Sequence, residues 1–265
     1  MQNKAYTIGI IGAGFVGSAV ASFFKNARVY DKFKPMDSFE EVMSRDVIFV
    51  CVPTPYNKGF DRSYLDEVFN EIAKYKKERL VVIKSTVIPG TTEYFQKQHP
   101  HLLILFNPEF LTQNTAEYDF SHPDKQIIGY TEKSKHIAED VLSILPDAPY
   151  KKTMPSTSSE LVKYAVNSYY ASKVIFGNVL YDIASALGLD YEIVKQAFVS
   201  DKRICDSHFD VMHGGYRGYG GKCLPKDLLA LHDLGKSLGI DVSFLDAIDK
   251  TNRGLGGDHN LPLRE

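Results

Sequence analysis

Short, continuous apolar runs alternate with longer amphipathic stretches in the first half of the chain. Most runs have polar or turn-forming flanks, and their continuous Val, Ile and Leu character is typical of parallel strands covered by helices on both faces. The alternation predicts βαβ units that build a doubly wound, mostly parallel α/β sheet. The runs that we expect to form strands are residues 7–11, 27–31, 46–52, 80–84, 102–106 and 126–130.

The pattern changes around residues 147–149 and again at 154–155, after which only helical periodicities follow. Thr157 with Glu160 three positions later has the spacing of a capping box, which predicts the start of a long helix. Gly188 is expected to end that helix as a C-terminal cap. Further helices are expected near residues 191–198, 225–238 and 244–252.

The long helix carries an apolar seam at helical spacing. A helix of this length commonly connects two domains or forms a dimer seam, so we expect a homodimer. The chain would then divide into an α/β domain over residues 1–150, an all-helical central domain over 151–256, and a tail over 257–265. The seam residues are Val162, Val166, Tyr169, Phe176, Leu180, Ile183 and Leu187.

Composition and charge are those of a globular protein. Of 265 residues, 44% are hydrophobic and 24% are charged, with a formal net charge of -2, which disfavours membrane-spanning and disordered classes. No basic tract indicates a nucleic-acid partner. Residues 1–6 lead into the first expected strand without a signal segment, so we expect a cytoplasmic protein without a membrane partner.

A glycine-rich loop, G-x-G-x-x-G at residues 12–17, stands between the first expected strand and a helix. Its glycines permit a tight turn and let a pyrophosphate approach the backbone at the helix N-terminus. Asp31 follows about 20 residues later and would accept from a ribose 2′-hydroxyl, which favours NAD in a Rossmann-like domain. Lys32 and Lys34 lie beside it and could accept a 2′-phosphate, so NADP stays open. The expected cofactor contacts here are Gly12, Gly14, Phe15, Val16, Gly17, Asp31 and Lys32.

Cys223 stands among glycines and lysines in the stretch 218–227. Pro225 suits the first turn of a helix, so the cysteine is expected just before a helix N-terminus, between Lys222 and Lys226. The helix dipole and the two cations both lower the pKa of a thiol, and the glycines would let a substrate approach the sulfur. The pattern predicts a reactive thiolate.

The other two cysteines have different surroundings, and three cysteines do not make a disulfide framework. Cys51 lies within an apolar run and is expected in the core, whereas Cys205 has no nearby cation beyond an arginine and is interpreted as structural. The histidines, including His99 and His101, lack metal-ligand spacing, so no metal site is expected.

Lys163 and Asn167 are four residues apart on the long helix and therefore share one of its faces. A lysine and an amide placed in this way can bracket a carbinol oxygen, the lysine as base or electrostatic stabiliser and the amide as orienter. Taken alone, such a pair is more often two solvated surface residues. The glycine loop and the Cys223 segment favour the catalytic interpretation of this pair.

Together these residues resemble the UDP-glucose 6-dehydrogenase family, part of the UDP-glucose/GDP-mannose dehydrogenases, without its C-terminal UDP-binding domain. The resemblance follows the family's order across almost the whole chain, and the segment with Cys223 is its most specific part. The matching segments are residues 12–17, 51–55, 84–87 and 107–111, Lys163 with Asn167, and residues 220–227.

The resemblance implies an NAD-dependent, four-electron oxidation of the C6 hydroxymethyl group of a UDP-hexose, most simply UDP-glucose to UDP-glucuronate. Cys223 would form a thiohemiacetal and then a thioester that water hydrolyses, while NAD takes up the hydride. The cofactor contacts that the resemblance adds are Pro53, Thr54, Thr86 and Lys226. The substrate contacts that it implies are Glu109, Phe110, Leu111, Lys163, Asn167, Tyr216 and Gly220.

The resemblance also implies roles for individual side chains. Lys163 would stabilise oxyanions and assist deprotonation, and Asn167 would orient the reacting oxygen. Asp227 would tune that lysine and a catalytic water. Glu109, the candidate general base for thioester hydrolysis, and Thr86 would position the water.

Three departures from the family stand out. The family commonly has a second glutamate where this chain has Gln113, so a contact to cofactor or water is expected to differ and hydrolysis to be slower. The segment between Asp31 and Asp46 is shorter than usual. Family members also continue into a further α/β domain that supplies much of the UDP-binding surface, whereas this chain stops soon after residues 251–253.

Two alternatives therefore stay open. A two-electron dehydrogenase of the β-hydroxyacid type shares a helix-borne lysine and asparagine, but leaves Cys223 without a role. An NAD-binding protein that works only with a partner chain carrying the missing domain would explain the short chain and Gln113.

Overall fold

The structure is a computed structural model that describes residues 6–212 and 215–255. The chain forms two compact units. Unit 1 comprises the chain up to Lys163 except Tyr56–Phe60, and unit 2 comprises Tyr56–Phe60 with the chain from Tyr164 onward. The expected tail, residues 257–265, lies outside the described residues.

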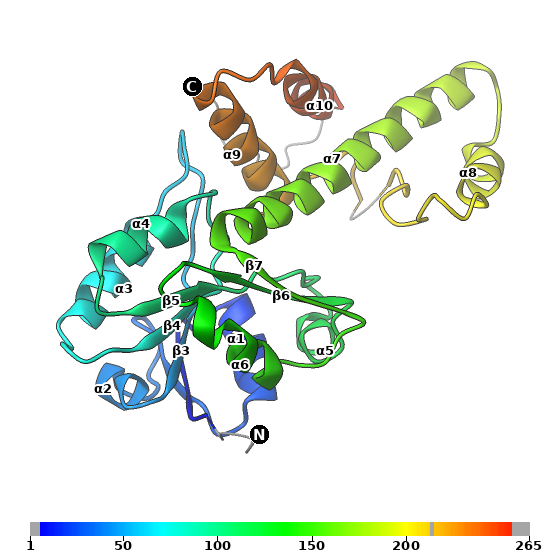
Figure 1. Cartoon of the computed structure of the whole chain (residues 1–265). Helices are drawn as coiled ribbons and strands as arrows, with labels where there is room; N and C mark the ends of the chain where they lie inside the picture. Colours follow the sequence, from blue (N-terminus) through cyan, green and yellow to red (C-terminus); the bar gives the residue numbers. More distant parts are fainter. Residues whose placement is uncertain (1–5, 213–214, 256–265) are drawn as a thin grey trace. The chain divides into compact units, whose positions relative to one another are not determined.

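Unit 1 is built on one sheet with the strand order β2-β1-β3-β4-β5-β6-β7 (Figure 1). All neighbouring strands are parallel except β5 and β6, so the predicted doubly wound α/β sheet is confirmed. Strand order reverses between β1 and β3, and sheets of this kind bind ligands where the carboxyl ends of strands meet such a reversal. The strands are β1 Ile8–Ile11, β2 Arg28–Tyr30, β3 Val47–Val50, β4 Leu80–Ile83, β5 Leu103–Phe106, β6 Lys125–Tyr130 and β7 Tyr150–Pro155.

Strand β7 was missing from the predicted strands, and it lies where the helical domain was expected to begin. It pairs in parallel with β6, from Tyr150 opposite Lys125 to Pro155 opposite Tyr130. Most of its side chains are exposed, so its faces are less covered than those of the central strands. Such a strand needs no apolar run, which is why the hydrophobic pattern did not predict it.

Helices cover both faces of the sheet (Figure 1), with α3 and α4 on one face and α1, α5 and α6 on the other. One core cluster packs inward-facing strand residues such as Phe49 and Leu105 against α1, α5 and α6. On the opposite face Phe69 of α3 stacks on Phe95 of α4, with ring centroids 4.1 Å apart. These helices are α1 Phe15–Phe23, α2 Phe39–Met43, α3 Ser63–Ala73, α4 Thr91–Gln98, α5 Ala116–Ser121, the short 3-10 helix Lys135–Ile137 and α6 Ala138–Ile144.

The remaining helices confirm the helical pattern predicted for the second half. They are α7 Ser156–Ala186, α8 Tyr191–Val199, α9 Leu224–Ser237 and α10 Ser243–Gly254. Gly188 follows α7 with a φ of 69°, its N–H donates to the Ser185 carbonyl, and the next N–H donates to the Ala184 carbonyl. This is the Schellman arrangement, so the predicted C-terminal cap is confirmed.

The capping box predicted at Thr157 and Glu160 is wrong. Thr157 lies inside the first turn of α7, and the buried Glu160 carboxylate accepts hydrogen bonds from the N–H groups of Gly90 at 2.6 Å and Thr92 at 2.8 Å. The Thr92 hydroxyl donates to it as well, at 2.6 Å. Gly90 is the N-cap of α4, so Glu160 satisfies the free N–H groups of a different helix.

The core of unit 2 packs α7 against α9 and α10. Ala171 and Ile175 of α7, Leu228 of α9 and Ile248 of α10 are buried in one cluster. No helix among the described residues combines the length and the apolar character needed to cross a membrane.

Candidate active site and cofactor pocket

A cavity of about 760 Å³ lies in unit 1, at the carboxyl ends of β1 and β3 where the strand order reverses. Most of the predicted cofactor contacts line it together: Gly12, Gly14, Phe15, Val16, Asp31, Lys32 and Pro53. Among the residues predicted from the glycine loop, Gly17 is not part of this lining and is buried behind it. The cavity therefore joins the glycine loop to the acid at the end of β2.

Two of the three glycines of the loop, Gly12 and Gly17, are required by its geometry. Gly12 has a φ of 97°, and its N–H donates to the Tyr30 carbonyl at 2.8 Å. A Cβ at Gly17 would lie 1.8 Å from the Gly12 carbonyl oxygen, whereas a Cβ at Gly14 would meet no protein atom within 4 Å. The backbone of Gly14 is thus open to a ligand at the N-terminus of α1. This arrangement fits a dinucleotide, whose pyrophosphate such a loop can bind through its N–H groups.

Asp31 lies within hydrogen-bonding reach of this loop. One carboxylate oxygen accepts from the Ala13 N–H at 2.7 Å and the other from the Phe33 N–H at 2.9 Å. Burial raises the pKa of Asp31, but these two N–H groups and the nearby Lys34 outweigh it, so that its pKa lies below the ordinary value. The acid is therefore ionised at neutral pH and can accept a hydrogen bond from a ribose hydroxyl.

Thr54 and Thr86 follow β3 and β4. The Thr54 hydroxyl donates to the Thr86 carbonyl at 2.6 Å, which links the two loops at the same edge of the sheet. Thr54 is buried and Thr86 half-buried. The structure thus brings these two predicted residues together, next to Pro53 of the cavity.

Glu109 and Lys163 form a buried ion pair in unit 1, with 2.8 Å between carboxylate oxygen and ammonium nitrogen. Burial raises the pKa of Glu109, but the Lys163 ammonium, the Leu111 N–H and a second lysine outweigh it and hold the pKa below its ordinary value. Lys163 also lies 5.5 Å from the centroid of the Phe110 ring. Predicted catalytic and substrate residues therefore meet here, while Gln113 lies exposed after this segment.

The second lysine, Lys84, belongs to the matching segment 84–87 but was given no role in the sequence analysis. It follows β4, is buried, and donates to the Asn107 side-chain oxygen at 2.6 Å. Asn107 in turn donates to the Ile127 carbonyl at 2.8 Å. Burial lowers the pKa of Lys84 from 10.5 to about 8. The signal in the sequence was a charged residue at the end of an otherwise apolar strand.

Unit 2 holds the other predicted catalytic residues. Cys223 is the N-cap of α9, with Pro225 in the first turn, as predicted. Asp227, one turn into α9, is buried and accepts from the Asn167 amide at 2.5 Å. Lys226 also forms an ion pair with Asp227. Asn167 and Asp227 are thus brought together across two helices of this unit.

Two further residues predicted at the substrate, Tyr216 and Gly220, lie in the segment that precedes α9. Both residues are half-buried. Their assignment to the substrate stays a prediction.

The cysteines differ in exposure. Cys51 is buried, and burial raises the pKa of its thiol to about 12, which confirms the core prediction. Cys205 is exposed, and its sulfur lies 3.4 Å from the Ser207 hydroxyl. Lys173, a cation that the sequence did not indicate, donates to the Cys205 carbonyl at 2.7 Å, and the interpretation of Cys205 as structural stays a prediction. Among the described residues, no group of three or more His, Cys, Asp or Glu side chains could hold a metal ion.

A glycine loop, an acid after β2 and a cavity at the reversal of strand order define a dinucleotide-binding domain of the Rossmann-like class. Residues 22–145 match the NAD binding domain of the UDP-glucose/GDP-mannose dehydrogenase family, and residues 157–254 match the central domain of the same family. The chain belongs to this family of oxidoreductases, and NAD is its cofactor.

Known relatives include enzymes named for two different sugars. The chain is 33% identical over 241 residues to a UDP-glucose 6-dehydrogenase of Rickettsia conorii, which covers 87% of this chain and 54% of the relative. It is 33% identical over 234 residues to a GDP-mannose 6-dehydrogenase of Pseudomonas aeruginosa, covering 82% and 52%. The solved UDP-glucose dehydrogenase of Pyrobaculum islandicum superposes with a TM-score of 0.82 at 30% identity, covering 96% of this chain and 69% of that one. The chain spans about half the length of the curated relatives it matches.

Proposed function

We propose that the protein oxidises the C6 hydroxymethyl group of a UDP-hexose, most simply UDP-glucose, to a carboxylate in two NAD-dependent steps. The observation that carries this proposal is the placement of Cys223 at the N-terminus of α9, one turn before the buried Asp227. A two-electron oxidation of an alcohol needs no such nucleophile, whereas the oxidation of an aldehyde to an acid is made easier by one.

In the first step, the C6 hydroxyl loses its proton to water; Lys163 assists this loss by stabilising the oxyanion, and Asn167 orients the oxygen. When bound, NAD accepts the hydride that leaves C6, and an aldehyde remains. Lys163 suits the stabilisation of a developing oxyanion because its ammonium is buried, where charge interactions are stronger than in water. Asn167 suits orientation because the Asp227 carboxylate holds its amide in place.

In the second step, the Cys223 thiolate adds to the aldehyde carbon to form a thiohemiacetal. This adduct would then lose a second hydride, to a second NAD+, together with its hydroxyl proton, which leaves a thioester. Water cleaves the thioester, so that the carboxylate is released and the thiol is restored. Glu109 is the proposed general base for this hydrolysis, since its carboxylate is ionised and buried beside Lys163. Each step then has a separate, lower barrier.

The nucleotide sugar is a finer part of the proposal. Relatives of nearly equal similarity are named for UDP-glucose and for GDP-mannose. We propose UDP-glucose because the relative with a TM-score of 0.82 and 30% identity is also named for this substrate. A two-electron β-hydroxyacid dehydrogenase is the weaker alternative because it gives Cys223 no task.

A second candidate function is NAD binding without independent turnover, in which the chain acts only together with a partner chain that carries a UDP-binding surface. Binding of NAD without turnover, restored by such a partner, would distinguish this function from complete catalysis in the chain alone.

We also propose a homodimer that pairs through α7. In the single chain, the predicted seam leaves large apolar side chains exposed, among them Tyr169, Phe176, Ile183 and Leu187. A second copy of the helix would cover them. The cytoplasmic location and the absence of nucleic-acid and membrane partners stay predictions.

The test is to follow NADH absorbance to completion with excess NAD+ and a limiting amount of UDP-glucose. We expect two NADH for each sugar, and loss of this yield in Cys223→Ser. The matched control is Cys205→Ser, which removes the other exposed thiol and should keep the yield. One NADH for each sugar, or full yield in Cys223→Ser, would refute the proposed thioester route.

A further inference from the structure

The cavity in unit 1 is lined by several carboxylates, which we call its acidic wall. Besides Asp31, its lining includes Glu40 of α2 and Glu67 and Glu71 of α3. Lys32 is the one basic residue among the described residues that line it. Carboxylates therefore outnumber ammonium groups around the position where Asp31 would meet a ribose.

Both lysines that follow Asp31 already have partners. The Lys32 ammonium lies 2.6 Å from a carboxylate oxygen of Glu67, and this hydrogen bond raises the pKa of Lys32 above its ordinary value. Lys34 donates to the Ala13 carbonyl in the glycine loop and is not part of the cavity lining. The two cations that left NADP open in the sequence are thus directed to a carboxylate and to a backbone carbonyl.

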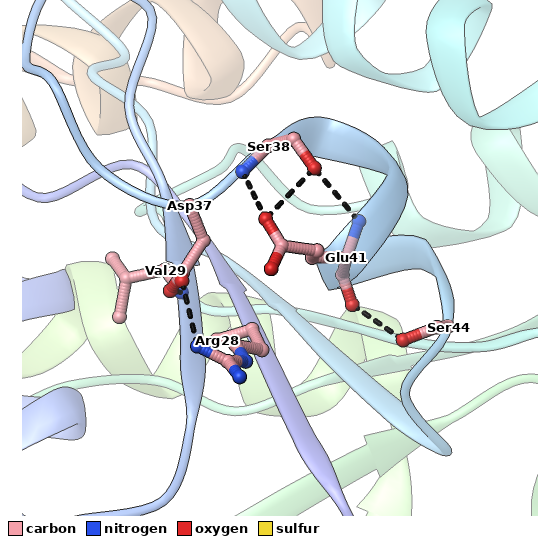
Figure 2. Close-up of polar contacts among 6 residues, drawn as sticks. All are labelled: Arg28, Val29, Asp37, Ser38, Glu41 and Ser44. Carbon is pink, nitrogen blue, oxygen red and sulfur yellow. Dashed lines mark hydrogen bonds and ion pairs between the residues drawn. The ribbon is translucent and has the colours of Figure 1, made fainter.

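The segment that carries Glu40 is held in place by its own hydrogen bonds (Figure 2). Asp37 accepts from the Val29 N–H at 2.8 Å and from Arg28 at 2.9 Å, which ties the segment to β2. Ser38 and Glu41 form a capping box at the start of α2. Because this first turn is fixed, the Glu40 carboxylate of α2 stays in the lining of the cavity.

We propose that Glu67 is a cofactor-specificity residue: by holding the Lys32 ammonium, it keeps the wall beside Asp31 anionic and excludes the 2′-phosphate of NADP. A 2′-phosphate carries close to two negative charges near neutral pH. Binding it beside Asp31 would require it either to face the carboxylates or to draw Lys32 away from Glu67. NAD has a neutral 2′-hydroxyl at this position, so it neither meets repulsion from the carboxylates nor breaks the Lys32–Glu67 ion pair.

Glu67 and Lys32 are half exposed, with side-chain exposures of 50% and 53%. Such a pair contributes little to stability, so a change at Glu67 acts mainly on the charge of the wall. Glu67→Lys exchanges a negative for a positive charge and leaves Lys32 available to the phosphate. The inference concerns the cofactor of the proposed oxidation, and binding tests it without any turnover.

The experiment is calorimetric titration of the whole chain with NAD+ and with NADP+ at low salt. For Glu67→Lys we expect the Kd of NADP+ to fall about tenfold and that of NAD+ to change by less than about threefold. Glu67→Gln should give a change of about threefold for NADP+, because it removes one charge instead of two. The gain for NADP+ should shrink at high salt, where exposed charges are screened.

The matched control is Glu132→Lys. Glu132 also pairs with a lysine, Lys135, at 3.8 Å and is more exposed, but it does not line the cavity. An equal gain in NADP+ affinity for this variant would overturn the proposal, because net charge would then explain it. Unchanged NADP+ affinity in both Glu67 variants, with NAD+ binding intact, would overturn it too. Failure of the wild type to bind NAD+ would overturn the assignment of the cavity, independently of whether the sugar is oxidised.

Discussion

Lys84 has an unusual position for an ammonium group, and its removal should change how stability depends on pH. The side chain is 2% exposed, and its hydrogen-bond partner is the neutral amide of Asn107. Burial lowers the pKa of Lys84 from 10.5 to about 8. At about 1.4 kcal/mol for each pH unit between the two values, the charged form costs the folded state about 3 kcal/mol at pH 7.

Lys84→Met removes this cost but leaves the Asn107 oxygen without its donor, a loss of about 1–3 kcal/mol. At pH 7 the variant should therefore equal or exceed the wild type in stability, by up to about 2 kcal/mol. Between pH 8 and 10.5 the unfolded wild type binds the proton and the folded wild type does not, so wild-type stability rises with pH. The advantage of the variant should fall by about 2 kcal/mol between pH 7 and 9.5.

The assay is urea unfolding at a series of pH values from 7 to 9.5, followed by far-UV circular dichroism. The chain contains no tryptophan, so circular dichroism is the more informative signal. The control is Lys152→Met, which removes an exposed lysine of β7. If the difference between Lys84→Met and wild type stays constant over this range, the buried ammonium is not the group that the reasoning requires.

Two further variants test the framework around the site. Gly17→Ala would place a Cβ 1.8 Å from a backbone carbonyl oxygen of the glycine loop. We expect the free energy of unfolding in urea to fall by about 1–3 kcal/mol and NAD+ binding, measured by calorimetry, to weaken. Wild-type values for both would show that the loop can relax. Glu160→Gln keeps only one acceptor oxygen for the donors of Gly90 and Thr92, and it should lower the free energy of unfolding by about 1–2 kcal/mol. The control Glu93→Gln, in the first turn of α4, should not lower it. Equal losses in the two variants would contradict the capping role of Glu160.

The parallel sheet could be predicted because burial on both faces leaves a mark in the sequence. Every central strand must be apolar along its length when helices cover both sides of it. Strand β7 could not be predicted in this way, because its residues Lys151 and Lys152 are exposed and need not be apolar. The cofactor loop was predictable because local backbone geometry requires glycine at Gly12 and Gly17.

Long-range partners were less accessible from the sequence. Glu160 has the spacing of a capping residue for its own helix, and only the fold shows that its carboxylate accepts hydrogen bonds from Thr92 of α4 instead. The Glu109–Lys163 pair joins residues from two different elements, and nothing local to either one indicates the other. For such pairs the family resemblance supplied what periodicity and spacing could not.

The position of the segment Tyr56–Phe60 in the sequence affects how the chain folds during its synthesis. It belongs to unit 2, although it lies between two stretches of unit 1, and the Tyr56 hydroxyl donates to Asp233 at 2.5 Å across 177 positions of sequence. On the ribosome, the early strands can pair long before the helix that carries Asp233 has been synthesised. Unit 2 is therefore completed last and by a contact of high sequence separation, which is a slow kind of step in folding. Cutting the chain after Lys163 would give a fragment that includes Tyr56 but not its partner, so the two units do not correspond to two independent, continuous pieces of the chain.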